Sequence, residues 1–143
     1  MKTLMTIAAA TLAFATPLLA ESHAAMGDAD AGEKGFKKCK SCHMIANGDE
    51  TIVKGGKTGP NLYGVIGRTA GTAEDFKYGD DLVAAGAAGL VWDEATLASY
   101  VADPRGFVQE TLDDSGAKSK MTFKLKKGGE DVAAYLASVV PAE

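Results

Sequence analysis

The sequence predicts an all-α fold in which a few short helices are joined by long loops. Apolar residues recur at helical spacing in three segments, residues 28–40, 93–101 and 130–140. No run of convincing length shows the two-residue alternation of a half-buried strand. Residues 44–73 carry seven glycines and no sustained period, yet they are too apolar for a disordered segment. We therefore expect this loop to wrap around a buried group that supplies apolar surface.

The first helix is expected to begin at a capping carboxylate, Asp28 or Asp30, and to run to about residue 40. Gly32, Phe36 and Cys39 then fall on one face of that helix. A glycine on a buried face indicates that another helix approaches closely there.

Two further helices are marked by their ends. Asp93 caps the middle one, which stops before Pro104, and the last one covers about residues 130–140. The segment 75–85 has room for short helical pieces. Residues 105–128 are glycine-containing and are expected to form a second long loop.

The chemistry of the chain centres on its only two cysteines, Cys39 and Cys42, followed directly by His43. A C-x-x-C-H run indicates c-type haem attachment. Two thiols three residues apart on one turn can each add to one vinyl group of the same porphyrin. The imidazole is then held where it can bind iron from the proximal face. The motif predicts one covalently bound haem c per chain.

The two cysteines allow three other interpretations. A thioredoxin-like dithiol also has C-x-x-C, but it follows a buried strand, whereas the residues before Cys39 look helical. A zinc site needs about four ligands, and only His43 and His23 accompany the two thiols. A structural disulfide leaves the histidine unexplained. The haem interpretation accounts for all three residues.

Residues 1–24 have the layout of a cleaved secretory signal peptide: a basic start, an uncharged apolar stretch and small residues. Cleavage after Ala24 fits the small-x-small rule, and cleavage after Ala20 or Ser22 stays open, so the boundary lies between 20 and 25. A retained membrane anchor is the alternative, but the apolar run is short for a span. Residues 25–143 are then a monohaem domain in the periplasm, where covalent haem attachment is possible.

A low-spin electron-transfer haem needs a sixth ligand, usually Met or His. No second histidine survives processing. Among the methionines, Met1 and Met5 lie in the leader, Met26 lies at a terminus, and Met44 follows the proximal ligand too closely to reach the opposite face. Met121 remains as the distal iron ligand, the alternative being a methionine that only fills the core.

The formal net charge is −4, and removing residues 1–24 deletes one base and one acid and leaves it unchanged. Nucleic acid is therefore not expected as a partner. Lysines nevertheless gather near the attachment motif and around Met121, where they could form a positive front for docking or an ordinary solvated surface. These lysines are Lys38, Lys40, Lys57, Lys118, Lys120, Lys124, Lys126 and Lys127.

The assembled motifs resemble the class I cytochromes c, and most closely the bacterial cytochrome c2 branch. The resemblance covers nearly all of the chain after the leader. Its elements are residues 39–43, 57–64 (Lys-Thr-Gly-Pro-Asn-Leu-Tyr-Gly), Gly67-Arg68, 76–78, Trp92, Tyr100 with Pro104, and residues 120–123.

The resemblance implies the cytochrome c fold and roles for particular residues. The Pro60 carbonyl would accept a hydrogen bond from the His43 imidazole, which fixes the ring and raises its basicity. Arg68, Tyr78 and Trp92 would bind an inward-facing haem propionate.

On the distal side, Tyr100 would donate to, or lie near, the Met121 sulfur, and Phe123 would cover the ring edge. Gly32 and Phe36 would pack against the last helix. For each aromatic residue, simple core packing is the alternative.

The resemblance further implies a soluble, monomeric, periplasmic one-electron carrier rather than an enzyme. Its donor would be a cytochrome bc1 complex, and its acceptor a photosynthetic reaction centre or a terminal oxidase. A haem enzyme or gas sensor with a labile sixth ligand, and a thiol oxidoreductase, are the alternatives.

Overall fold

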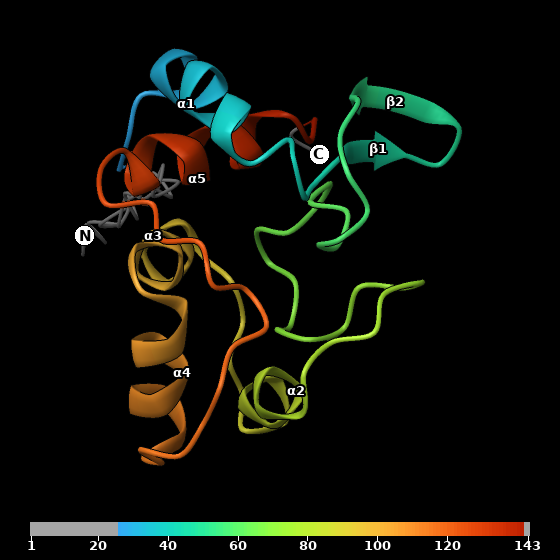
Figure 1. Ribbon diagram of the computed structural model, residues 1–143. Helices are drawn as coiled ribbons and strands as arrows, with labels where there is room; N and C mark the ends of the chain where they lie inside the picture. Colours follow the sequence, from blue (N-terminus) through green and yellow to red (C-terminus); the bar gives the residue numbers. More distant parts are fainter. Residues whose placement is uncertain (1–25, 142–143) are drawn as a thin grey trace, which may run out of the picture.

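Short helices and one hairpin, separated by long loops, make up residues 26–141, the part of the chain that the computed structural model describes (Figure 1). The expected helix-rich fold is confirmed. None of the helices in residues 26–141 combines the length and the apolarity needed to cross a membrane. The leader predicted for residues 1–24 lies outside the described residues. In chain order the elements are α1 (Ala29–Gly35), the 3-10 turn η1 (Phe36–Lys38), β1 (Ile45–Asn47), β2 (Glu50–Val53), α2 (Asp80–Ala87), α3 (Glu94–Ala102), α4 (Pro104–Leu112) and α5 (Gly129–Ser138).

Helices α1 and α5, from opposite ends of the chain, lie against each other (Figure 1). A Cβ on Gly32 would overlap the backbone carbonyl of Asp131, so only glycine permits this approach. Phe36 is fully buried, and its ring lies 5.8 Å from the ring of Tyr135. The expected close approach at Gly32 is confirmed. Asp28 caps α1, which ends at Gly35, earlier than expected, and η1 continues the turn.

Helix α3 begins as predicted, with a capping box. The backbone N–H of Thr96 donates to the Asp93 carboxylate at 2.7 Å, and the backbone N–H of Asp93 donates to the Thr96 hydroxyl at 2.9 Å. The buried side of α3 presents Tyr100, whose ring lies 5.0 Å from Trp92 and 5.8 Å from Phe107. These three aromatic residues join α3 to α4 and anchor the loops on either side.

The expectation that residues 105–128 form only loop is wrong, because α4 occupies the first part of this segment. Pro104 stands in the first turn of the helix, where a missing N–H costs nothing. Asp103 accepts a hydrogen bond from the Gly106 N–H at 3.2 Å, and Val108 is fully buried. The sequence did not indicate this short helix because the segment has few apolar residues and contains Gly106, a poor helix former.

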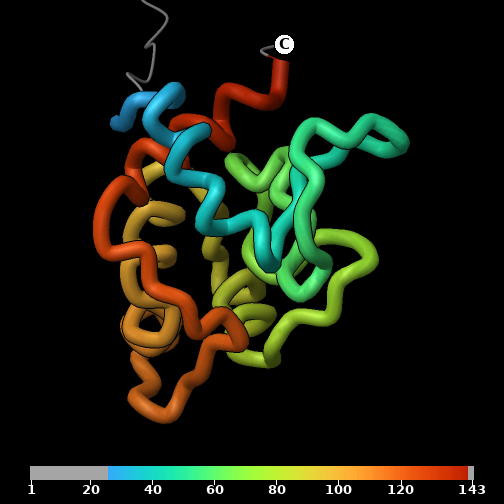
Figure 2. Tube along the Cα trace, turned by 45° about the horizontal axis from the view of Figure 1, so that its top comes forward, coloured from blue at the N-terminus to red at the C-terminus, as the bar shows by residue number. Residues whose placement is uncertain are grey.

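The expectation that residues 44–73 contain no sheet also needs correction, because β1 and β2 pair as a small antiparallel hairpin. Ile45 is fully buried, and Gly48 makes the turn with a φ of +56°. Residues 54–73, the rest of the expected loop, contain no helix or strand, and within the segment 75–85 helix α2 begins at Asp80. In Figure 2 this green loop lies on the side of the molecule away from the orange helix α4.

Candidate haem site

The two cysteines and the histidine are brought together by a single turn that follows η1. The backbone N–H groups of Cys42 and His43 both donate to the Cys39 carbonyl, at 3.1 and 2.9 Å. Both thiols are free, with Cys39 half-buried against the core and Cys42 exposed. The turn therefore presents two thiols and an imidazole from one short stretch of backbone.

A glycine-rich strap after the hairpin closes over this turn. The Gly56 N–H donates to the Lys40 carbonyl at 2.9 Å, and the Gly59 N–H donates to the Cys42 carbonyl at 2.8 Å. A Cβ at Gly59 would overlap the imidazole ring of His43. The glycines are therefore required by close packing against the motif.

The His43 imidazole is oriented by the backbone. Its Nδ1 lies 2.8 Å from the Pro60 carbonyl oxygen. Because a carbonyl can only accept, Nδ1 carries the proton and the electron pair of Nε2 is free to bind iron. Burial lowers the pKa of His43, and the hydrogen bond to Pro60 raises it by a smaller amount. The neutral imidazole, the form that binds a metal, is therefore favoured.

Arg68 holds the loop that contains Pro60. Its guanidinium donates to the backbone carbonyls of Asn61 and Tyr63 at 3.2 and 3.3 Å. The Asn61 amide in turn exchanges two hydrogen bonds with the backbone of Ala46, at 3.0 and 2.7 Å. The hydrogen bonds of Arg68 in the structure thus go to the loop backbone. The backbone N–H of Trp92 donates to the Arg68 carbonyl at 2.9 Å, which brings these two expected propionate ligands together.

Tyr100 connects α3 to the segment that carries Met121. Its hydroxyl lies 3.1 Å from the Ser119 hydroxyl. Within the described residues, this is the hydrogen bond that the hydroxyl makes, and its partner lies two residues before Met121 in the chain. Burial raises the pKa of Tyr100, the Ser119 bond lowers it, and nearby Tyr78 raises it slightly. Tyr78 is half-buried and packs edge-on against Phe76 at 4.8 Å.

Met121 is half-buried and packs against the core, as a distal ligand requires. Phe123, expected to cover the haem edge, is 46% exposed to solvent. The segment just before Met121 is fastened to residues near α2. The Lys118 N–H donates to the Asp81 carboxylate at 2.8 Å, and the Lys120 ammonium donates to the Lys77 carbonyl at 3.0 Å.

The residues present fit a haem attached through thioethers. Residues 39–43 offer two free thiols and an imidazole nitrogen, and Met121 offers a thioether sulfur from a separate, half-buried segment, which are groups that a c-type haem can bind. Burial raises the pKa of Cys39, against a smaller lowering by Lys38, whereas redox-active dithiols have a lowered thiol pKa. Between residues 26 and 141, no three His, Cys, Asp or Glu side chains cluster as a metal site.

All eight lysines named above are exposed. Lys124 forms an ion pair with Asp103 at 2.8 Å, and the Lys120 ammonium donates to the Lys77 carbonyl. Within residues 26–141, none of the other lysines in this set forms a salt bridge.

Sequence reasoning missed the contacts that hold the loops. The pair Gly55-Gly56, two adjacent residues without side chains, is a sequence signal for close backbone packing. The Asn61 and Gln109 amides gave no sequence signal, since either could equally have faced solvent.

Known proteins resemble the chain over most of its length. It is 63% identical over 139 residues to cytochrome c-551 of Roseobacter denitrificans, covering 96% of this chain and 95% of that protein. It is 60% identical over 131 residues to cytochrome c2 of Rhodobacter capsulatus, covering 91% and 96%. The crystal structure of that cytochrome c2 superposes with a TM-score of 0.79 and 64% identity, covering 80% of this chain and 100% of that chain. No family profile matches the sequence.

Proposed function

Because the chain belongs to the class I c-type cytochromes, in the group of cytochromes c2 and c-550, we propose that it carries single electrons between membrane complexes in the periplasm. The donor we propose is a cytochrome bc1 complex, and the acceptor is a photosynthetic reaction centre or a terminal oxidase. Members of this family are electron carriers and not enzymes, and they carry one covalently attached haem c per chain.

The orientation of His43 carries the proposal for the iron site. A histidine held at Nδ1 by the Pro60 carbonyl, directly after two free thiols, leaves only Nε2 to bind. The carbonyl partner also raises the basicity of the ring, which strengthens its bond to a metal. We assign Cys39 and Cys42 to the two thioethers and His43 to the proximal iron ligand.

We assign Met121 as the distal ligand, which supplies a soft thioether on a half-buried loop. Sulfur favours ferrous over ferric iron, so it raises the reduction potential of the bound haem. Around the cofactor we assign Pro60, Arg68, Tyr78, Trp92, Tyr100 and Phe123 to the haem pocket. When bound, the haem supplies a one-electron ferric–ferrous couple, and the protein limits access to it.

The lysines around Met121 and the attachment motif would steer the carrier to its partners. A positive front on a molecule of net charge −4 makes a dipole whose effect is screened over about 10 Å at 0.1 M salt. Residues 1–24 would direct export and be removed, leaving residues 25–143 as the monohaem domain.

The iron site is tested on the purified protein. Haem staining of a denatured gel should detect covalent attachment in the parent and lose it when Cys39 and Cys42 are both replaced by Ala. The reduced parent should not bind carbon monoxide at neutral pH, whereas Met121→Ala should bind it. Carbon monoxide binding to the parent would instead indicate a haem enzyme or gas sensor.

Docking is tested by the salt dependence of electron transfer to the acceptor complex. The rate should fall as ionic strength rises, and it should fall again in the double variant Lys126→Glu with Lys127→Glu. Lys124→Gln together with Asp103→Asn removes a whole ion pair and leaves the net charge unchanged, so this double variant should slow the reaction less. Rates independent of salt would contradict the electrostatic docking.

A further inference from the structure

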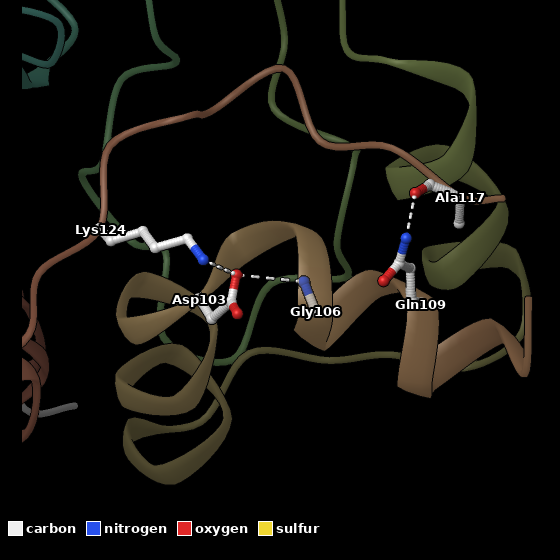
Figure 3. A network of polar contacts seen from close by, with 5 residues as sticks. All are labelled: Asp103, Gly106, Gln109, Ala117 and Lys124. Atoms are coloured by element: carbon white, nitrogen blue, oxygen red, sulfur yellow. Dashed lines mark hydrogen bonds and ion pairs between the residues drawn. The ribbon is translucent and has the colours of Figure 1, made fainter. Parts of the chain in front are cut away.

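The segment that carries Met121 is tied to α4 by one side-chain amide. The Gln109 Nε2 donates to the backbone carbonyl of Ser115 at 2.7 Å. It also donates to the backbone carbonyl of Ala117 at 3.1 Å (Figure 3). Since both partners can only accept, the orientation of this amide is determined. The Ala117 side chain is 1% exposed, so the amide fixes the segment where it enters the core.

A second contact fastens the segment beyond Met121. Asp103 caps α4 through the Gly106 N–H, and its same oxygen, Oδ1, pairs with the Lys124 ammonium at 2.8 Å (Figure 3). Both side chains of the ion pair are about half exposed, at 49% and 51%. An exposed pair of this kind contributes little, so its effect is expected to be smaller than that of Gln109.

Between these two ties lie the residues that matter for the iron. Within the described chain, Lys118, Ser119 and Lys120 also form hydrogen bonds, with Asp81, Tyr100 and Lys77, whereas residues 121–123 form none before the ion pair of Lys124. The position of the Met121 sulfur therefore depends on where the ends are held. Gln109 lies on α4, which packs against α2 and α3, so it connects the segment to a rigid element.

We propose that Gln109 and, more weakly, Asp103 are positioning residues that hold the Met121 segment at its two ends and so keep the sulfur in place as the distal ligand. The inference rests on the proposed ligation by Met121. Neither residue touches the ligand, and each acts through the backbone of the segment.

The test measures how easily an added ligand displaces Met121 from the ferric holoprotein. Imidazole can bind the iron only after the sulfur has left, so its affinity reports the opening of the segment. Gln109→Met keeps the size of the side chain and removes both donors, and it should raise the imidazole affinity about fivefold. Gln109→Glu places a carboxylate against two carbonyl oxygens and should raise it further.

Two matched variants separate hydrogen bonding from other effects. Gln109→Lys restores a donor to the two carbonyls and should return the affinity to within about twofold of the parent. Glu110→Gln makes the same change of charge on the next, exposed position of α4 and should leave the affinity unchanged. At the other end, Asp103→Asn keeps the cap and loses the charge, so it and Lys124→Gln should each have an effect below about twofold.

The outcomes distinguish the inference from its premise. The weak sulfur-to-iron charge-transfer band of the ferric parent reports whether Met121 is bound at all, and a parent without it would overturn the proposed ligation. If the band is present in the parent but Gln109→Met binds imidazole as the parent does, the positioning role is overturned, even if the unfolding temperature falls. Should Gln109→Met fail to fold, the comparison of Gln109→Glu with Gln109→Lys gives the same decision.

Discussion

The segments that present His43 and Met121 are fastened by different kinds of contact. His43 is surrounded by backbone: the strap from Gly56 to Gly59 bonds to the motif through main-chain groups and packs against it without side chains. The segment around Met121 is held largely by side chains, among them Gln109, Tyr100 and Asp81.

This difference predicts how each side responds to mutation. Backbone contacts cannot be removed by truncating a side chain, but they leave no room for an added atom. Side-chain hydrogen bonds can be removed one at a time, each at a modest cost of about 1 kcal/mol. An added methyl group on the His43 side should therefore lower the free energy of unfolding strongly. On the Met121 side, each lost hydrogen bond should lower it by a small amount.

The largest loss of stability is expected when the haem cannot be attached, because both the His43 side and the Met121 side are expected to pack against it. In the double variant Cys39→Ala with Cys42→Ala, haem cannot be attached, and apolar loop residues such as Leu62 and Ile66, which the protein only partly buries, stay unsupported. We expect this chain to lack a cooperative thermal transition followed by circular dichroism. Ser41→Ala keeps both thiols and should melt as the parent does. A cooperative transition in the double variant would contradict the expectation.

A methyl group added beside His43 should cost more than one added beside the Met121 segment. Gly59→Ala puts a Cβ into the imidazole ring and should lower the free energy of unfolding by about 2–3 kcal/mol. Gly79→Ala meets only the flexible side chain of Lys120, at 3.3 Å, and loses a little as a helix cap, so about 0.5 kcal/mol is expected. Denaturant titration of both holoproteins gives the two values. If both variants lost the same free energy of unfolding, the His43 side would not be more sensitive to an added methyl group than the Met121 side.

Removing one hydroxyl should loosen the Met121 side alone. Tyr100→Phe deletes the hydrogen bond to Ser119 and should cost about 1 kcal/mol of unfolding free energy. The far-red band of the ferric protein should weaken, while covalent haem attachment is unaffected. Tyr63→Phe is the control, because in residues 26–141 its hydroxyl makes no hydrogen bond to the protein. An unchanged band in Tyr100→Phe would show that the Ser119 contact does not hold the segment.

The smallest effect concerns the cap of α3, on which Tyr100 lies. Hydrogen bonds from Thr96, the backbone N–H first and the hydroxyl second, lower the pKa of Asp93 below its ordinary value of 3.8. The ionised form is thus favoured in the folded state, so its stabilisation is full above about pH 4 and is lost as the pH falls below that. Asp93→Asn still caps but does not titrate, so its unfolding free energy should fall less than the parent's between pH 5 and 3. Because the carboxylate is exposed and solvent screens it, the difference should be small, and urea titration at the two pH values measures it. Parallel pH profiles would contradict it.

Local chemistry made several elements predictable. The thiols and imidazole of Cys39, Cys42 and His43 lie within one turn, so their spacing alone indicates haem attachment. Asp93 predicts the start of α3 because its capping box involves only residues 93 to 96. Gly32 indicated the approach of α5 because only a missing side chain leaves room for another helix.

The missed elements depend on partners far along the chain. Helix α4 has few apolar residues and an early glycine, and it is stable because Val108 and Phe107 find the core formed by α3. The hairpin of β1 and β2 is too short to be recognised from its pattern, and the burial of Ile45 in the core stabilises it. The contacts of the Arg68 guanidinium with the Asn61 and Tyr63 carbonyls depend likewise on the fold of residues 61–63, while its contact with a propionate stays a prediction.

The sequence by itself thus determined the attachment chemistry, the caps and the family, because each resides in neighbouring residues or in a long shared pattern. Tertiary structure decided how the loops are held, which lysine forms an ion pair, and which carbonyls before Met121 bind the Gln109 amide. Those properties arise from atoms brought together by the packing of distant elements, and no spacing along the chain encodes which side chain will reach which carbonyl.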